Sequence, residues 1–267
     1  MARMGLRWRE VERSLEMRIQ SLLDEIALLR EAGQLPTQGQ LMRMQRYQSL
    51  LRQVREELAG YEAWATRQIA AEQRELARMG IESAQAAIRA SGVRAAFNRL
   101  PVSAVENMVG LAGDGSPLFA VLQKRALWPD AVDGLTNALV KGVALGWNPR
   151  KTALRMADGL AQGLNKALLI ARTEQLRVYR HASVEQYRAS GVVSKMKRLA
   201  TKDDRTCMAC LMSDGELLEL GEELSDHPGG RCTSVPVVVG MPEVRWQTGR
   251  EWFERQSPER QKAKMGP

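Results

Sequence analysis

The chain has 267 residues, of which 44% are hydrophobic and 26% are charged, which is typical of soluble proteins and enough for one large domain or two smaller ones. It contains no apolar run of membrane-spanning length and does not begin like a signal peptide, so we expect cytoplasmic synthesis, reduced thiols and no membrane partner. The net charge is +8, and residues 101–200 supply most of it, with 14 basic against 7 acidic side chains (+7). This excess is compatible with nucleic acid or an acidic protein as partner and establishes neither.

Two apolar stripes with helical spacing predict a long helical hairpin over residues 1–91. The first stripe lies in 6–31 and comprises Trp8, Val11, Leu15, Ile19, Leu22, Ile26 and Leu29. Thr37 and Gln40 form a capping box that opens the second helix. Its stripe comprises Leu41, Met44, Leu51, Val54, Leu58, Tyr61 and Ala65. The short break favours an antiparallel pair, which is either a simple bundle or a coiled-coil-like arm that docks on a partner or self-associates.

Residues 92–190 are predicted to form a central helical domain. The pattern breaks at 113–117 and 128–130, and helices are expected at 132–145, from 148 onward and at 166–190. Gly159 and Gly163 allow either close packing or a break in the middle helix. In the last helix Glu174 and Arg177 are three residues apart, which predicts an ion pair that ties neighbouring segments together.

Residues 191–240 are predicted to form a small β-rich lobe, and 241–267 a short helix with a flexible tail. The segment 192–200 alternates like a half-buried strand whose outward side carries Lys195, Lys197 and Arg198, a candidate contact for nucleic acid or a partner. A second strand is expected at 235–239, at a sheet edge because it contains Pro236, and a short third one at 217–220. The fold class is therefore α+β, mainly α.

The three cysteines of the chain lie within 26 residues, together with one of its two histidines. Cys207, Cys210, His227 and Cys232 follow the spacing C-x2-C-x16-H-x4-C. Three thiolates and one imidazole are a common donor set of structural zinc sites. The cluster therefore predicts a structural Zn²⁺ that stabilises the small lobe.

Other interpretations of the cysteines remain open at this point. Cys207 and Cys210 could be a redox pair, or all three thiols could be free, although the chain around them lacks a thioredoxin-like βαβ pattern. A catalytic zinc is disfavoured because four protein ligands leave no position for water. Asp203 and Asp204, which precede Arg205, are predicted to form an Asx-type turn that shapes the Cys207–Cys210 loop.

The order of these motifs resembles the phage Mu F-like head morphogenesis family, the minor capsid proteins of tailed phages and prophages. The similar region covers residues 140–239. Its shared motif residues, beside the four metal-ligand candidates, are Arg172, Thr173, Glu174, Asp203, Asp204, Arg205, Asp214, Gly215 and Arg231. One departure is Gly230, because family members often carry a cysteine there in the pattern His-Pro-x-Cys-Arg-Cys. The set Cys207, Cys210, His227 and Cys232 survives this change.

The resemblance implies a low-copy, portal-associated head protein that acts in procapsid assembly and in DNA packaging or delivery. Portal and other head proteins would be its partners, first in the host cytoplasm and then in the virion. One alternative is a nucleic-acid-binding protein in which a zinc knuckle beside basic residues grips phosphates without reading sequence. A second alternative is a zinc-dependent hydrolase or nuclease. Its catalytic parts would be Asp203, Asp204, Glu174 and a zinc-bound water. We expect no enzymatic activity.

Overall fold

A computed structural model describes residues 2–93, 102–222, 224 and 226–265. The described chain is mainly helical with a small β lobe, as the sequence predicts, and the three strands of the lobe pair antiparallel. Its internal contacts divide it into two compact units: Met1–Ala70 with Gly110–Arg172, and Ala71–Val109 with Thr173–Pro267. Both boundaries fall inside long helices, α3 (Gln45–Ala90) and α6 (Pro149–Ser190), so each helix contributes to both units.

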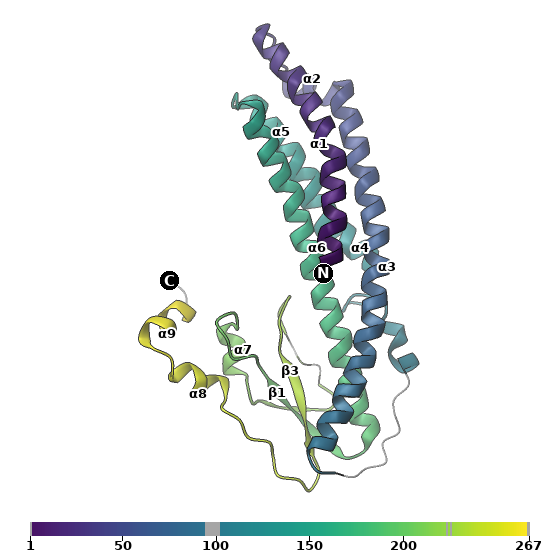
Figure 1. Ribbon diagram of the computed structural model, residues 1–267, viewed down its shortest axis with the longest axis vertical. Helices are drawn as coiled ribbons and strands as arrows, with labels where there is room; N and C mark the ends of the chain where they lie inside the picture. Colours follow the sequence, from purple (N-terminus) through teal and green to yellow (C-terminus); the bar gives the residue numbers. More distant parts are fainter. Residues whose placement is uncertain (1, 94–101, 223, 225, 266–267) are drawn as a thin grey trace. The chain divides into compact units, whose positions relative to one another are not determined.

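The first unit contains the predicted hairpin, in which α1 (Ala2–Glu31) runs antiparallel to the first part of α3 (Figure 1). The residues that face each other reverse order along the two helices: Ser14 donates to Glu57 at 2.7 Å and Arg18 to Ser49 at 2.6 Å. The short α2 (Gln38–Arg43) starts with the capping box of Thr37 that the sequence indicates. The two predicted stripes are buried against each other because a packed helix pair removes both from water.

After the hairpin in chain order, the first unit continues with α4 (Leu118–Leu122), a π-helix (Gln123–Val132) and α5 (Asp133–Ala144). The break predicted at 128–130 is instead part of this π-helix, which runs through Pro129. The helix predicted to start at Lys166 is in fact the continuation of α6.

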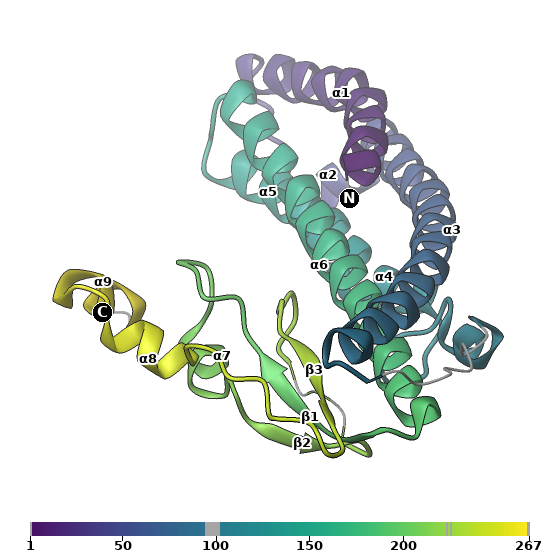
Figure 2. The same cartoon turned by 60° about the horizontal axis from the view of Figure 1, so that its bottom comes forward.

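Small residues bring α5 and the first part of α6 into close contact (Figure 2). A Cβ on Gly134 would lie 3.0 Å from the Cα of Gly159, and one on Gly163 would lie 3.0 Å from the Cβ of Ala131. The helices therefore cross nearly backbone to backbone. Gly159 and Gly163 serve close packing, the first of the two roles that the sequence allowed, and α6 passes through them without a break.

The second unit packs the ends of α3 and α6 on the sheet. Its strands are β1 (Val193–Leu199), β2 (Leu217–Glu219) and β3 (Thr233–Val238), in the order β2-β1-β3 with antiparallel pairing. The apolar face of β1 lies on α3 and α6 through Ile88, Val184, Tyr187 and Met196. Pro236 is on an edge strand as predicted, since β3 pairs with β1 alone among the described strands.

The remaining elements of the second unit are short. A 3-10 helix (Val102–Met108) follows α3, and α7 (Met208–Met212) lies between β1 and β2. The tail forms two helices, α8 (Gly249–Glu254) and α9 (Pro258–Met265), where the sequence indicated one helix and a flexible end. Lys264 connects the second of these helices, α9, to the rest of the unit. Its Nζ donates to the carbonyl oxygens of Asp203 at 2.9 Å and Asp204 at 2.8 Å.

The α5–α6 crossing gives a stability prediction. Gly159→Ala should lower the free energy of unfolding by about 1–3 kcal/mol, because the new Cβ would lie 2.8 Å from the backbone of Gly134. Gly60→Ala, in α3, is the matched control: nothing lies within 4 Å of its Cβ, so better helix propensity should raise stability by up to about 1 kcal/mol. Urea unfolding followed by circular dichroism measures both. Equal stability of the two variants would contradict the close crossing.

Candidate metal centre

The first two thiols are presented by the loop that leads into α7. Asp203 shapes this loop as predicted, since its Oδ1 accepts the backbone N–H of Arg205 at 3.0 Å and the hydroxyl of Thr206 at 2.9 Å. Cys207 then caps α7, and its Sγ accepts the backbone N–H of Cys210 at 3.4 Å. The two-residue gap thus turns both sulfurs toward one side of the loop.

The imidazole comes from a tight turn before β3. Gly230 N–H donates to the carbonyl of His227 at 2.9 Å, with Pro228 second in the turn and Gly229 third at φ +73°. Proline followed by a left-handed glycine is the signature of a type II turn. His227 Nδ1 lies 3.0 Å from the carbonyl oxygen of Pro228, and since only N–H can donate there, the tautomer leaves Nε2 free to bind a metal.

The two segments bring the predicted ligands to one place. Cys207, Cys210, His227 and Cys232 all line a cleft of about 40 Å³, which is room for an ion. The donor atoms of Cys207, Cys210 and His227 lie within 4.8 Å of one another. Cys210 also belongs to a second such group, with Asp226 and Cys232. These groups could hold a metal ion.

The spacing and chemistry of the donors fit a tetrahedral ion. Cys207 Sγ and His227 Nε2 are 3.4 Å apart. In a tetrahedral zinc complex, bonds of about 2.3 Å to sulfur and about 2.0 Å to nitrogen place such a pair roughly 3.5 Å apart. Three thiols and an imidazole are also soft or borderline donors of the kind that zinc prefers.

Asp226 is a residue of the site that the sequence analysis did not single out. Its Oδ1 lies 3.7 Å from the Sγ of Cys210 and accepts the backbone N–H of His227 at 3.0 Å. Its Oδ2 accepts Arg180 Nη2 at 2.6 Å, and the carboxylate is 2% exposed. In the sequence, only its position next to His227 points to a role in the site. Eleven other acidic residues also lie after position 200, so residue type alone does not single out Asp226.

Two arginines complete the surroundings of the buried thiols. Arg180 reaches from α6, and beside its ion pair with Asp226 it donates to the carbonyl oxygens of Cys232 at 2.7 Å and Gly230 at 2.9 Å. Arg198, from β1, places Nη2 3.8 Å from the Sγ of Cys210 and 3.9 Å from Asp226. Arg198 is therefore a buried neighbour of the cluster, where the sequence placed it on an outward basic face.

The electrostatics differ between the thiols. Burial raises the pKa of Cys210 to about 12, and the neighbouring thiols Cys232 and Cys207 add to the effect. Burial also raises the pKa of Cys207, but hydrogen bonds from Cys210 and the nearby His227 outweigh it, and the net shift is downward. A metal ion bound here would have to displace the proton of Cys210, so the affinity for such an ion should increase with pH.

Two ion pairs fix the rim of the site. Arg231 makes a bidentate contact with Asp203, at 2.7 and 2.6 Å, and this contact holds the pKa of Asp203 well below its usual range. Thr173 on α6 accepts the backbone N–H of Gly229 at 2.9 Å. Asp204 is exposed and pairs with Arg260 at 3.2 Å. Asp203 and Arg231 thus act in the framework of the loop.

Asp214 is a buried junction in the same lobe as the candidate metal centre. Its carboxylate accepts the backbone N–H groups of Ala200 at 2.7 Å and Gly249 at 2.8 Å, the indole of Trp246 at 3.1 Å and Lys202 Nζ at 3.2 Å. The following residue, Gly215, has φ +91° and continues the turn. This one side chain therefore joins the end of β1 to the start of α8.

The other predicted residues are engaged within the chain or exposed. Glu174 and Arg177 form the expected pair at 2.7 Å, and Arg172 is exposed on α6. Lys195 is exposed and pairs with Glu219 at 2.6 Å, and Lys197 pairs with Glu243. The basic side of β1 is thus partly neutralised by acidic partners.

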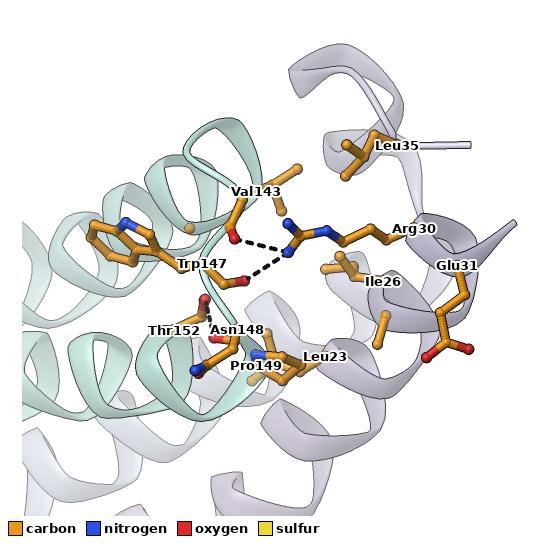
Figure 3. Close-up of a pocket in the computed structure, with 13 residues that line it drawn as sticks. Leu23, Ile26, Arg30, Glu31, Leu35, Val143, Trp147, Asn148, Pro149 and Thr152 are labelled. Carbon is orange, nitrogen blue, oxygen red and sulfur yellow. Dashed lines mark hydrogen bonds between the residues drawn. The ribbon is translucent and has the colours of Figure 1, made fainter. Parts of the chain in front are cut away.

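A separate cavity of about 190 Å³ lies in the first unit between α1, α5 and the start of α6 (Figure 3). Its lining is largely apolar, including Leu23, Ile26 and Val143. Arg30 crosses its mouth and donates to the carbonyl of Gly146 at 2.8 Å. The lining offers room for an apolar side chain and contains a single acidic residue, Glu31.

Comparison with known proteins matches residues 133–235 to the family model described as Phage Mu protein F like protein. This region of the chain is similar to that family. The match extends from α5 to β3 and includes all four predicted ligands, and it confirms the resemblance seen in the motifs. No curated protein and no solved structure matches the chain. Within the described part of the chain, no helix has the length and apolar character needed to cross a membrane.

The Asp214 junction can be tested by substitution. Asp214→Ala should lower the free energy of unfolding by about 3–5 kcal/mol, because it leaves buried donors and Lys202 without their acceptor. Asp204→Ala is the control, since that carboxylate is exposed and should change stability little. Denaturant unfolding of both variants gives the comparison. A near-neutral Asp214→Ala would show that the junction does not stabilise the lobe.

Proposed function

We propose that this chain is a structural protein of the phage head: a minor capsid protein, associated with the portal, that acts in procapsid assembly and in DNA packaging or delivery. The observation that carries the proposal is the family match over residues 133–235. In this interpretation the helical hairpin and central helices contact portal or other head proteins, and the β lobe is a rigid module. The protein would assemble in the host cytoplasm and remain in the virion, in the head interior or portal region.

The metal centre in this proposal is structural Zn²⁺ held by Cys207, Cys210, His227 and Cys232. Bound metal would supply crosslinks between the α7 loop, the His227 turn and the start of β3, which few apolar contacts connect. The donor set supports a closed site because four protein ligands fill a tetrahedral shell. Asp203 and Glu174, candidates for acid–base chemistry, are committed to Arg231 and Arg177. These features favour a structural role over a hydrolase or nuclease.

Nucleic-acid binding is less well supported than protein contact. The phosphate-gripping surface suggested for β1 depends on Lys195, Lys197 and Arg198. Arg198 is 8% exposed, and both lysines have acidic partners. Strong non-specific binding needs several free cations at the surface, so these three residues of β1 give it little support.

Metal content tests the zinc proposal. The protein purified under reducing conditions should contain about one zinc per chain, and Cys207→Ser, Cys232→Ser and His227→Ala should each reduce this amount and the melting temperature. His181→Ala is the matched control, because the chain's other histidine lies beside Glu185 on α6. Elemental analysis with thermal unfolding gives the result. Wild-type protein free of metal, or equal loss in His181→Ala, would contradict the assignment.

Head assembly tests the partner. Co-expressed with the portal and capsid proteins of its phage, the chain should co-purify with portal protein and enter procapsids. The nucleic-acid alternative predicts instead that DNA binding weakens steeply with salt and that Lys195→Gln with Lys197→Gln reduces the slope. Procapsids that form normally without recruiting the chain would count against the head-protein proposal.

A further inference from the structure

The cavity between α1, α5 and the start of α6 combines an apolar interior with a charged mouth (Figure 3). Leu23 and Ile26 of its lining are buried, whereas Leu35, which also lines it, is 51% exposed. Leu145, the residue before Gly146 of the lining, is 66% exposed. Large apolar side chains are thus left in water at and beside the cavity, where contact with another molecule would bury them.

The size of the cavity favours a side chain over a free small molecule. Its volume is about 190 Å³, whereas pockets for drug-sized ligands usually measure about 300–1,000 Å³. A ligand confined to the cavity would also leave Leu145 in water. A side chain of a partner protein can fill such a cavity while the residues next to it cover the surrounding surface.

Arg30 supplies a polar group at the mouth of this cavity (Figure 3). Its Nη1 donates to the carbonyl oxygens of Gly146 at 2.8 Å and Trp147 at 3.3 Å, so the loop after α5 holds the guanidinium in place. Within the described part of the chain, Nε and Nη2 of Arg30 have no acceptor. These two nitrogens form one edge of the guanidinium, and such an edge can bind a carboxylate through two parallel hydrogen bonds.

The segments around the mouth are basic. Residues 30–35 and 141–152 contain one acidic side chain, Glu31, and four basic ones, Arg30, Lys141, Arg150 and Lys151. All five side chains are exposed. This charge attracts carboxylates and disfavours basic partners.

We propose that this cavity is the docking site for a segment of a partner protein that presents a large apolar side chain next to a carboxylate. The apolar side chain enters the cavity, and the carboxylate accepts the N–H groups of Arg30 Nε and Nη2. This inference rests on the proposed function, because the partner would be another protein of the phage head. It adds the surface of the helical unit that binds this partner and the chemistry of the segment that is bound.

Synthetic peptides test the chemistry of the segment. The probe is a short glycine–serine peptide with one central leucine between two glutamates, titrated with the full chain and followed by the broadening of its NMR signals. Peptides with glutamines for the glutamates, or with serine for the leucine, should each bind at least about 10-fold more weakly, because each lacks one of the two contacts. Equal binding of the three peptides, or no binding of the probe at millimolar concentration, would overturn the inference.

Variants of the cavity separate its two parts. Arg30→Gln removes the charged group at the mouth and should weaken probe binding by about 10- to 100-fold. Ala27→Leu places a larger side chain in the lining and should abolish binding without a change of charge. The matched control is Arg43→Gln on α2, because Arg43 also donates to a backbone carbonyl, that of Gly39 at 3.0 Å, but does not line the cavity.

Ala27→Leu keeps the test decisive if Arg30→Gln does not fold. Because filling a cavity adds buried apolar contacts, this variant should melt at or above the wild-type temperature while it loses the probe. Unchanged probe binding in Ala27→Leu would contradict the docking site. Equal losses in Arg30→Gln and Arg43→Gln would contradict the role of Arg30.

Two other occupants would be recognised in the same experiments. If the chain dimerises in solution and Ala27→Leu makes it a monomer, the occupant is a second copy of the chain. If octanoate binds more tightly than the leucine–glutamate probe, the cavity is a site for a free carboxylic acid. Either result would overturn the proposal of a partner segment.

Head assembly distinguishes this inference from the proposed function. Co-expressed with portal and capsid proteins, Arg30→Gln and Ala27→Leu should enter procapsids at a small fraction of the wild-type level, and Arg43→Gln at the wild-type level. A wild-type chain that does not enter procapsids would overturn the proposed function, while the peptide titration would still decide what the cavity binds. A wild-type chain that enters them, with both cavity variants entering equally well, would overturn the docking site alone.

Discussion

The second unit depends on the contact that Arg180 makes with the segment between β2 and β3. That segment contributes little apolar surface, and the cluster formed by Ala200, Cys210 and Cys232 is small. Arg180 compensates with three directed bonds, to Asp226, Gly230 and the carbonyl of Cys232, all from one guanidinium on α6. The planar guanidinium group of arginine, with several N–H donors in fixed directions, can bind three acceptors in this way better than the ammonium group of lysine. The turn that presents His227 is thereby fixed to a helix rather than to a hydrophobic core.

The parts of the fold that periodicity governs could be predicted from the sequence. Spacings of three and four residues gave the hairpin, and alternation gave β1, because burial of one face imposes these periods. The capping box at Thr37 and the Asx turn at Asp203 were predictable for the same reason, since both are local in sequence. Residue types at short spacing predicted four candidate ligands, and the structure brings all four residues to one cleft, while their binding of a metal stays a prediction.

Features that depend on long-range contacts could not be predicted. Arg198 looked like an outward residue of an alternating strand, and only the position of Cys210 against that strand shows that it faces the thiols. The order of α9 depends on Lys264 reaching carbonyl groups some sixty residues earlier in the chain. The division of α3 and α6 between two units leaves no mark in their sequence, because each helix continues its pattern across the boundary.

Gly230 shows how the site accommodates its departure from the family pattern. A Cβ at this position would coincide with the carboxylate of Asp226, whose atoms are the nearest neighbours that it would meet. A side chain at 230 and a buried carboxylate at 226 therefore exclude each other in this backbone.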